Sequence, residues 1–311
     1  MVLEDRWLRE TYVDLLIEYA AKNKDIVILE ADLMKAGGTF RFAEKYPERT
    51  FDVGIQEANM IGTAAGMSAM GKIPFTHTFT AFATRRVCDQ VTLSVAYAGL
   101  NVKMMGSDPG VTAEYNGGTH MSMEDVSIMR NIPGMIVYEP VDSAQLKAIF
   151  PQIVDHYGPV YIRLLRRNAV KVFEDGETFE LGKGKLMREG SDVSIFATGI
   201  MVADAVEAVE ELEKEGIHAE LINIHTVKPL DEEMVLASVA KTGCAVTAEN
   251  HSVIGGLGSA VAELLVEKDP VPVKKVGVMD HFGEVGLTPY LKEKYGLTAK
   301  DIKAAIAMKK R

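Results

Sequence analysis

The sequence has few of the residues that mark several large classes of protein. Two of its 311 residues are cysteines, Cys88 and Cys244, and both lie in apolar surroundings. This count argues against a disulfide framework and predicts buried thiols in a reducing cytoplasm. Basic residues number 34 against 44 acids, a formal net charge of -10. A general nucleic-acid or anionic-membrane binder needs a basic face, so we expect neither kind of partner.

Long hydrophobic runs are also lacking. Uncharged stretches such as Ala58–Gly71 fall short of the roughly 18 apolar residues that a membrane-spanning helix needs. The first residues, MVLEDRWLRE, carry acids where a secretory signal has a basic start and an apolar core. The seven histidines are not clustered with cysteines in the manner of a zinc site. We therefore expect a soluble cytoplasmic protein without a metal site of its own.

Short apolar runs alternate with amphipathic segments, a pattern that predicts an α/β fold with parallel sheets. The first series predicts strands at 26–30, 50–55, 73–76, 102–105, 135–138 and 160–164, and helices at 4–22, 57–71, 82–98 and 143–156. The second predicts strands at 193–197, 219–222 and 245–247, and helices at 201–215, 231–240 and 258–266. The polar stretch 173–189 separates them, so we predict two domains, 1–172 and 190–311, joined by a linker.

The predicted helix 57–71 has almost no side-chain bulk along much of its length, as in Gly62-Thr63-Ala64-Ala65-Gly66. Glycine inside a helix costs about 1 kcal/mol relative to alanine. Such a helix is expected where another backbone packs closely against it. That backbone belongs either to its own sheet or to another subunit, and the sequence favours neither.

Several polar and aromatic residues stand at predicted strand ends, where parallel sheets bind ligands. Asp32 follows the strand 26–30, and Glu57 stands at a strand-to-helix junction within GIQEANM. The segment TFTAFATRR sets Phe79 and Phe82 three residues apart, and His120 ends the turn NGGTH. Asp32 and Glu57 could equally be ordinary carboxylates at helix N-termini.

Taken together, these motifs resemble the C-terminal half of a transketolase, the thiamine-diphosphate enzyme that moves two-carbon ketol units. The resemblance covers essentially the whole chain and includes GIQEANMIGTAAG, NGGTHMSMEDVSIMRNIPGM, ENHSVIGGLGSAVAELL and MDHFGEVG. It implies a pyrimidine-binding domain followed by a transketolase C-terminal domain. The family's Gly-Asp-Gly motif, which holds the metal with a downstream Asn, is absent. The chain therefore resembles one subunit of a split transketolase, whose N-terminal partner holds Mg2+ or Ca2+ in an α2β2 assembly.

The resemblance also implies roles for individual residues. Glu57 matches the glutamate that activates the cofactor through its pyrimidine ring, a role that needs a protonated carboxyl and suits a buried apolar pocket. Phe79 and Phe82 match the aromatics that stack on that ring, and Arg85 stands where the family has a third aromatic. The full set of expected cofactor-binding residues is Glu57, Phe79, Phe82, Arg85, Asp32 and Ile55.

On the substrate side, His120 matches a histidine that contacts the ketol unit. Arg9 and Arg166 match arginines that bind a sugar phosphate, although Arg163 and Arg167 are close enough to exchange places with Arg166. Three positions depart from the family pattern, and they are Ala36 in place of a serine, Asp108 in place of a phosphate-facing histidine, and Asn116 in place of an aspartate. Because Asp108 would repel a dianion, we expect a donor or acceptor other than the usual sugar phosphates.

Three competing functions share this domain plan. The segment GGTFRFAEKYP faintly resembles the E1 β subunit of a 2-oxo-acid dehydrogenase. The plan also occurs in 1-deoxyxylulose-5-phosphate synthase. A third alternative is a non-catalytic subunit that binds a partner, although the joint presence of Glu57, Phe79 and Phe82 argues against it.

Overall fold

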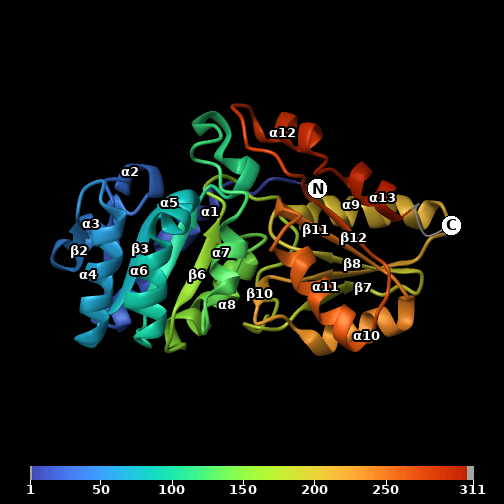
Figure 1. The fold of residues 1–311 in the computed structure, drawn as a ribbon. Coiled ribbons are helices and arrows are strands. Elements are labelled where there is room, and N and C mark those ends of the chain that lie inside the picture. Colours follow the sequence, from blue (N-terminus) through green and yellow to red (C-terminus); the bar gives the residue numbers. More distant parts are fainter. Residues whose placement is uncertain (1, 307–311) are drawn as a thin grey trace.

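The computed structural model describes residues 2–306 and shows two α/β units side by side (Figure 1). The first unit is built on a seven-stranded sheet with the order β10-β5-β6-β4-β3-β1-β2. Its strands are parallel except β10, which comes from later in the chain and pairs antiparallel with β5. The strands are β1 (Ile26–Glu30), β2 (Thr50–Asp52), β3 (Ile73–Phe79), β4 (Lys103–Ser107), β5 (Ile136–Tyr138), β6 (Val160–Leu164) and β10 (Thr226–Lys228).

Helices cover both faces of this sheet because its central strands are apolar on both sides. On one face lie α1 (Leu8–Lys22) and α8 (Ser143–Asp155). On the other lie α4 (Glu57–Ala69), the π-helix η3 (Val91–Tyr97) and α7 (Asp125–Asn131). This double cover leaves the carboxyl ends of the strands as the place where polar side chains gather.

The second unit has a five-stranded sheet with the order β12-β11-β8-β9-β7, parallel except for β7. Its strands are β7 (Lys185–Arg188), β8 (Val193–Ala197), β9 (Ala219–Asn223), β11 (Ala245–Ser252) and β12 (Val273–Val278). Helices α9 (Met201–Lys214) and α13 (Ala299–Ile306) cover one face. Helices α10 (Glu232–Thr242) and α11 (Leu257–Lys268) cover the other, and α12 (Thr288–Tyr295) lies above the boundary between the units (Figure 1).

The predicted α/β fold class with two mainly parallel sheets is confirmed. Predicted strands 26–30, 160–164 and 193–197 agree residue for residue with β1, β6 and β8. The stretch 173–189, predicted as a linker, contains β7, which joins the second sheet beside β9. Further elements that the pattern did not predict are α2 (Met34–Gly37), α3 (Phe40–Lys45), η1 (Pro47–Arg49), η4 (Gly110–Asn116), α7, β10, β12, α12 and α13.

The predicted helix 82–98 is broken, because Thr84 leaves helical geometry with φ -124° and ψ -82°. It forms α5 (Thr80–Ala83), η2 (Arg85–Val87), α6 (Cys88–Gln90) and η3 instead. Apolar periodicity detects the buried face of this region but not the change in backbone register. The break decides which arginine reaches the candidate site.

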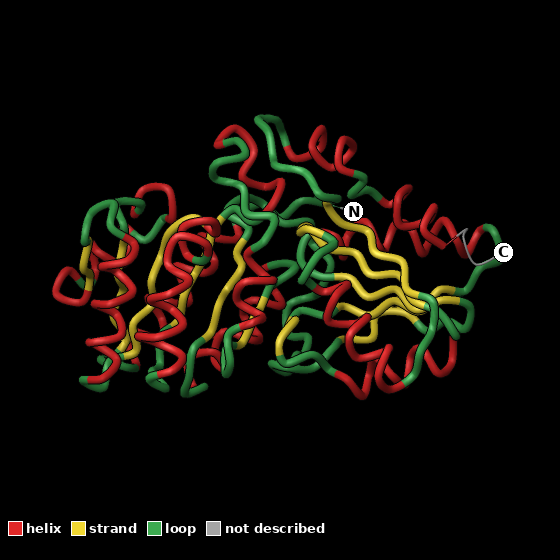
Figure 2. The backbone as a smooth tube through the Cα atoms, viewed as in Figure 1, coloured by secondary structure: helices red, strands yellow, loops and turns green. Residues whose placement is uncertain are grey.

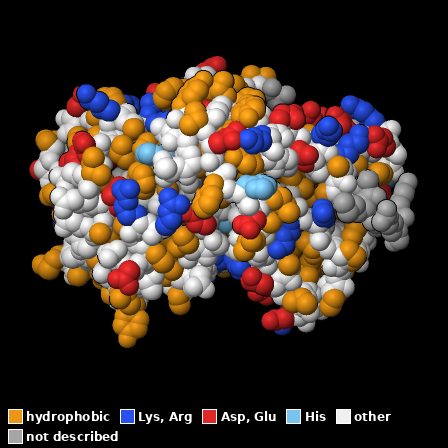
Figure 3. All heavy atoms as spheres, turned by 45° about the horizontal axis from the view of Figure 1, so that its top comes forward, with side chains coloured by type: hydrophobic (Ala, Val, Ile, Leu, Met, Phe, Trp, Pro, Cys, Tyr) orange, Lys and Arg blue, Asp and Glu red, His pale blue; other side chains and the backbone are white. Residues whose placement is uncertain are grey.

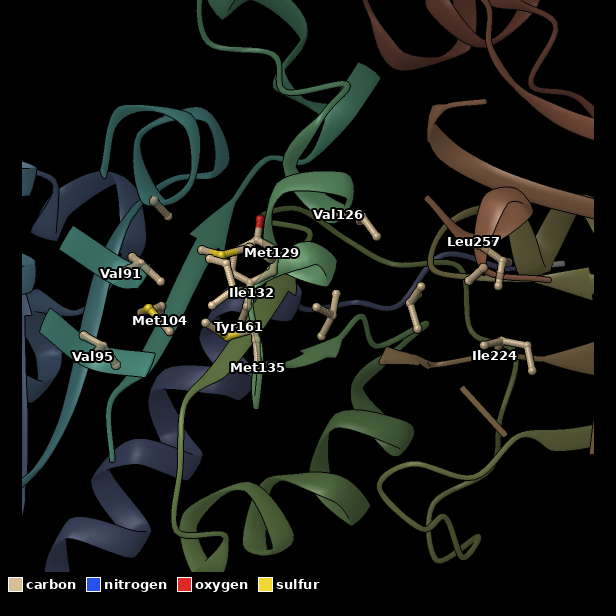
Figure 4. Close-up of a cluster of buried hydrophobic side chains, with 14 of the residues drawn as sticks. Val91, Val95, Met104, Val126, Met129, Ile132, Met135, Tyr161, Ile224 and Leu257 are labelled. Carbon is tan, nitrogen blue, oxygen red and sulfur yellow. The ribbon is translucent and has the colours of Figure 1, made fainter. Parts of the chain in front are cut away.

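The two sheets run in different directions, roughly upright in the first unit and roughly across the view in the second (Figure 2). A single buried apolar cluster nevertheless passes through both units. It includes Met104 and Tyr161 of the first sheet and Ile224 and Leu257 of the second unit (Figure 4). The units therefore share a core and are not independent bodies on a flexible tether.

Arg163, on β6, is the largest fully buried side chain among the described residues. Its guanidinium donates to Asp125 at 2.7 and 3.2 Å and to Glu139 at 2.7 Å. A fourth bond, 2.7 Å long, reaches the backbone carbonyl of Asn250 on β11. Arg163 therefore joins the two sheets through charge-assisted hydrogen bonds that use four of its five N–H donors.

Replacing Arg163 with methionine keeps the length of the side chain but leaves two buried carboxylates without their cation. We expect Arg163→Met to lower the free energy of unfolding by about 3–5 kcal/mol, measured by urea denaturation. Arg188→Met is the matched control, because Arg188 pairs with Glu213 on the surface and should cost less than about 1 kcal/mol. Equal losses in the two variants would contradict the role given to Arg163.

Candidate active site

Three ring side chains meet at the carboxyl end of β3. Phe79 ends β3 and Phe82 follows in α5, with ring centroids 6.1 Å apart in an edge-on arrangement. His120 contacts both rings, with centroid distances of 5.6 Å to Phe79 and 5.1 Å to Phe82. The structure therefore brings together three of the residues that the sequence motifs singled out.

Glu57 is the first residue of α4, and its side chain is only 3% exposed. Its Oε1 accepts a hydrogen bond of 2.7 Å from Nη1 of Arg86. The guanidinium carbon of Arg86 lies 3.7 Å from the Phe82 ring centroid, so the same group stacks on the aromatic ring. The expected apolar pocket around Glu57 is corrected here, because a cation faces this buried carboxyl.

Arg85 points elsewhere. It donates to Glu124 Oε1 at 2.7 Å and to the Thr119 carbonyl at 3.3 Å, and so supports the turn that carries His120. The spacing of three from Phe82 would place Arg85 on the ring only if the helix were continuous. The break at Thr84 brings the next residue, Arg86, onto Phe82 instead, which the sequence pattern did not reveal.

Asp108, directly after β4, is surrounded by Arg166, Arg167 and Arg9, and we call these four residues the charged group. Nε of Arg166 lies 3.0 Å from Asp108 Oδ2, and the Arg166 guanidinium carbon is 5.8 Å from the Phe79 ring centroid. Arg9, on α1, donates from Nη1 to the Ala36 carbonyl. Arg166 thus links this charged group to the ring cluster. Ala36 contributes its backbone carbonyl to Arg9.

Asp108 has an unusual backbone and an unusual environment. Its φ is +56°, in the left-handed region, and its side chain is fully buried. Burial raises the pKa of Asp108 to about 6, although Arg166, Arg167 and Arg9 each pull that pKa down. For Arg9 the effect of burial is opposite in sign, and burial together with the nearby Arg166 lowers the pKa of Arg9. The Asp108 carboxyl group therefore lies among arginines but is poorly solvated.

The three arginines at the end of β6 have distinct environments. Arg163 is committed to the buried ion cluster, and Arg167 pairs with Glu114 at 2.8 Å. Arg166 alone among these three lies between Asp108 and Phe79. The geometry therefore favours Arg166 over its two neighbours as the arginine beside the ring cluster.

The remaining predicted residues lie around this centre. Asp32 follows β1 with φ +59° and is exposed, and its backbone N–H donates to Asp52 Oδ1 at 3.1 Å. Ile55 is 71% exposed. Asn116 ends η4 and is half-buried. Contacts of Asp32, Ile55 and Asn116 with a cofactor or substrate stay predictions.

A buried polar chain next to the charged group was not anticipated. The Tyr12 hydroxyl lies 3.0 Å from His77 Nε2, and His77 Nδ1 lies 3.2 Å from Glu30 Oε1. Glu30 also accepts from Thr39 Oγ1. Strand alternation places His77 and Phe79 on the same face of β3. The alternation of side chains along the strand was the only sequence feature that could have indicated His77.

The second unit holds the loop that carries His120. Glu114, in η4, accepts from the Thr288 backbone N–H at 3.1 Å and from its hydroxyl at 2.7 Å. Gly118 packs so closely that a Cβ there would lie 2.2 Å from the Gly283 carbonyl oxygen. In Figure 1 the green segment that contains η4 lies beside α12 at the top of the molecule. The C-terminal unit therefore shapes the site without supplying its central residues.

The surface of the molecule is mixed in character. On the face in Figure 3, lysines and arginines alternate with acidic and apolar side chains. Within residues 2–306, no helix is both long and apolar enough to cross a membrane. Over the same residues, no group of three or more histidine, cysteine or acidic side chains is placed to hold a metal ion.

The raised pKa of Asp108 predicts a pH-dependent gain in stability on substitution. The folded chain keeps the Asp108 proton up to about pH 6, whereas an unfolded chain loses it near about pH 4. Stability therefore falls as pH rises through this window, and the loss is complete above it. Asparagine has no proton to lose and tolerates left-handed backbone.

We expect Asp108→Asn to raise the free energy of unfolding by about 3 kcal/mol at pH 8 and clearly less at pH 5. Urea denaturation at both pH values measures the difference. The matched control is Asp32→Asn, because Asp32 has a similar φ of +59° but is exposed. A gain that is the same at both pH values would rule out titration of Asp108 as its cause.

Comparisons with known proteins extend over both units. Residues 6–171 match the transketolase pyrimidine binding domain, and residues 182–302 match the transketolase C-terminal domain. The chain is 71% identical over 300 residues to the 6-deoxy-6-sulfo-D-fructose transketolase subunit SqwH of Clostridium sp. (strain MSTE9). That match covers 96% of this chain and 93% of the relative.

Two further similarities bear on the same question. A solved structure described as a split gene transketolase, inactive beta4 tetramer, has a TM-score of 0.90 and 47% identity, covering 97% of each chain. The 1-deoxy-D-xylulose-5-phosphate synthase 1 of Geobacter sulfurreducens is 39% identical over 296 residues. This match covers 94% of our chain but only 46% of the synthase. The resemblance inferred from the motifs is confirmed, and the chain belongs to the transketolase family.

Proposed function

We propose that the chain is one subunit of a thiamine-diphosphate-dependent transketolase and is active only together with a partner subunit. The observation that carries this proposal is the buried Glu57 beside the ring cluster of Phe79, Phe82 and His120, in a chain that matches a transketolase subunit over nearly its whole length. In the proposed α2β2 assembly the partner supplies the diphosphate site with its Mg2+ or Ca2+. The whole-length similarity to transketolase subunits favours this function over the synthase and dehydrogenase alternatives.

The residues present fit the pyrimidine ring that the family implies. The Arg86 guanidinium is a flat group with N–H donors, and it stacks on Phe82 while it donates to the buried Glu57. A flat nitrogen heterocycle makes the same two kinds of interaction. Phe79, Phe82 and Glu57 would hold the ring. Arg86, whose side chain is 43% exposed, has room to turn towards solvent.

Thiamine diphosphate supplies the carbon nucleophile that accepts a two-carbon unit from a ketose. Glu57 would hold a proton against a ring nitrogen and so favour formation of that nucleophile. Positioned proton transfer of this kind contributes roughly 10²–10⁴-fold to a rate. Thr119 Oγ1 lies 2.9 Å from His120 Nδ1, which leaves Nε2 of His120 for the ketol unit.

The substrate is proposed to be a sulfonated ketose. SqwH, at 71% identity, is a subunit of a transketolase for 6-deoxy-6-sulfo-D-fructose. The departures at Ala36, Asp108 and Asn116 are in keeping with a substrate other than the usual sugar phosphates. We therefore take 6-deoxy-6-sulfo-D-fructose as the first donor to test.

Glu57→Gln preserves size and hydrogen bonding but removes the exchangeable carboxyl proton. In the complex with the partner subunit we expect ketol transfer to fall to below a few per cent, with an unchanged circular dichroism spectrum. Glu213→Gln, in an exposed ion pair with Arg188 on the second unit, is the control and should keep full activity. A Glu57→Gln complex that retains more activity than this would contradict the catalytic role of Glu57.

We propose that the exposed side of α4 contacts another subunit. Its buried side, including Ile61, Ala64 and Ala65, packs on the sheet. At Gly62 and Gly66, on the opposite side, an added Cβ would meet no atom within 4 Å. The sheet therefore does not require these glycines. Exposed apolar residues just after α4 and on the adjacent η3 are Met70, Leu93 and Tyr97.

Gly62→Leu tests this surface without disturbing the fold. Leucine is the better helix former, so we expect no loss in melting temperature. Light scattering should nevertheless show that the variant no longer assembles with itself or with the partner subunit. Glu210→Leu, at an exposed position of α9, adds the same side chain elsewhere and should assemble normally. Normal assembly of Gly62→Leu would place the interface on another face.

A further inference from the structure

The charged group around Asp108 contains polar atoms that the described protein leaves unsatisfied. Both carboxylate oxygens of Asp108 and Nε of Arg9 are buried without a hydrogen-bond partner among residues 2–306. Arg166 Nε lies 3.0 Å from Asp108 Oδ2 as an ion pair, but outside hydrogen-bond geometry. Buried polar groups are normally hydrogen-bonded. Unsatisfied donors and acceptors of opposite charge at one place therefore point to a polar ligand.

The charge balance of this place is specific. Arg9 and Arg166 contribute two positive charges, and Asp108 contributes one negative charge when it is ionised. Arg167 also faces Asp108, but its own ion pair with Glu114 at 2.8 Å neutralises it. Glu10 also faces Arg9, but it is paired with Arg6 at 3.7 Å. The surplus is therefore one positive charge, which matches a ligand group that carries one negative charge.

Resting on the proposed function, we propose that Asp108 shifts the selectivity of the site away from donors that end in a phosphate and towards donors that end in a sulfonate. A sulfonate offers three acceptor oxygens and a single charge, whereas a phosphate monoester carries about -1.5 to -2 at pH 7. Arg9 and Arg166 attract both groups. Because Coulomb energy scales with the product of the charges, the phosphate is attracted up to twice as strongly by the arginines and repelled up to twice as strongly by Asp108. Asp108 therefore costs the phosphate more binding energy than the sulfonate.

The backbone at Asp108 makes a clean test possible. Its φ of +56° disfavours most side chains, but asparagine tolerates this conformation nearly as well as aspartate. Asp108→Asn therefore keeps the shape and the turn and removes only the charge. The variant separates charge selection from a merely structural role.

The experiment uses the complex of this chain with its partner subunit and two donors that share a fructose framework. These are 6-deoxy-6-sulfo-D-fructose and D-fructose 6-phosphate. For Asp108→Asn we expect the ratio of kcat/KM for the phosphate donor to that for the sulfonate donor to rise at least about tenfold at pH 7.5. The change should lie mainly in KM for the phosphate donor, with kcat for both donors nearly preserved.

Two further results keep this inference separate from the proposed function. If the wild-type complex turns over neither donor, the proposed function fails, and the inference falls with it. If the wild-type complex uses the sulfonate donor but the ratio stays unchanged in Asp108→Asn, only the charge selection by Asp108 is overturned. Asp175→Asn, which removes a carboxylate from an exposed ion pair with Lys147, is the matched control and should leave the ratio unchanged.

Discussion

The buried guanidinium of Arg163 holds together the parts of the molecule on which the site depends. It binds Asp125 at the start of α7, Glu139 just after β5, and the Asn250 carbonyl on β11. Such a cluster is costly to desolvate and gives little net stability over an apolar core, but its hydrogen bonds link three separate segments of the chain at one point. The strands that end at the candidate site are thereby held in one register relative to the second unit.

The position of the site depends on these strand ends. β3 delivers Phe79, β4 delivers Asp108, and the chain beyond β6 delivers Arg166 a few residues after Arg163. Because these strands are parallel and adjacent, their carboxyl ends bring the ring cluster and the charged group together. The second unit then holds the loop of His120 through the hydrogen bonds of Thr288 to Glu114. Precision in the site thus comes from elements far from it in sequence.

Strands buried on both faces, such as β1 and β6, were predictable because they are continuous apolar runs. The family motifs likewise located Glu57, Phe79, Phe82 and His120, since each lies in a segment of distinctive composition. The short strands β7 and β10 were not predictable, because their pairing depends on distant partners. Arg86 was missed for a different reason. Its position depends on a break at Thr84 that residue periodicity does not record.

The pairing of Arg86 with Glu57 has a consequence for the order in which such an enzyme is assembled. A subunit made separately has to remain folded with a carboxyl buried to 3% exposure, and Arg86 compensates that charge from within the same chain. In the proposed assembly, a cofactor ring that takes this place would have to break an ion pair first, so one subunit alone would bind it weakly. Contacts from a second chain would offset the loss. Cofactor loading and subunit assembly would then form a single linked equilibrium, in which each event strengthens the other.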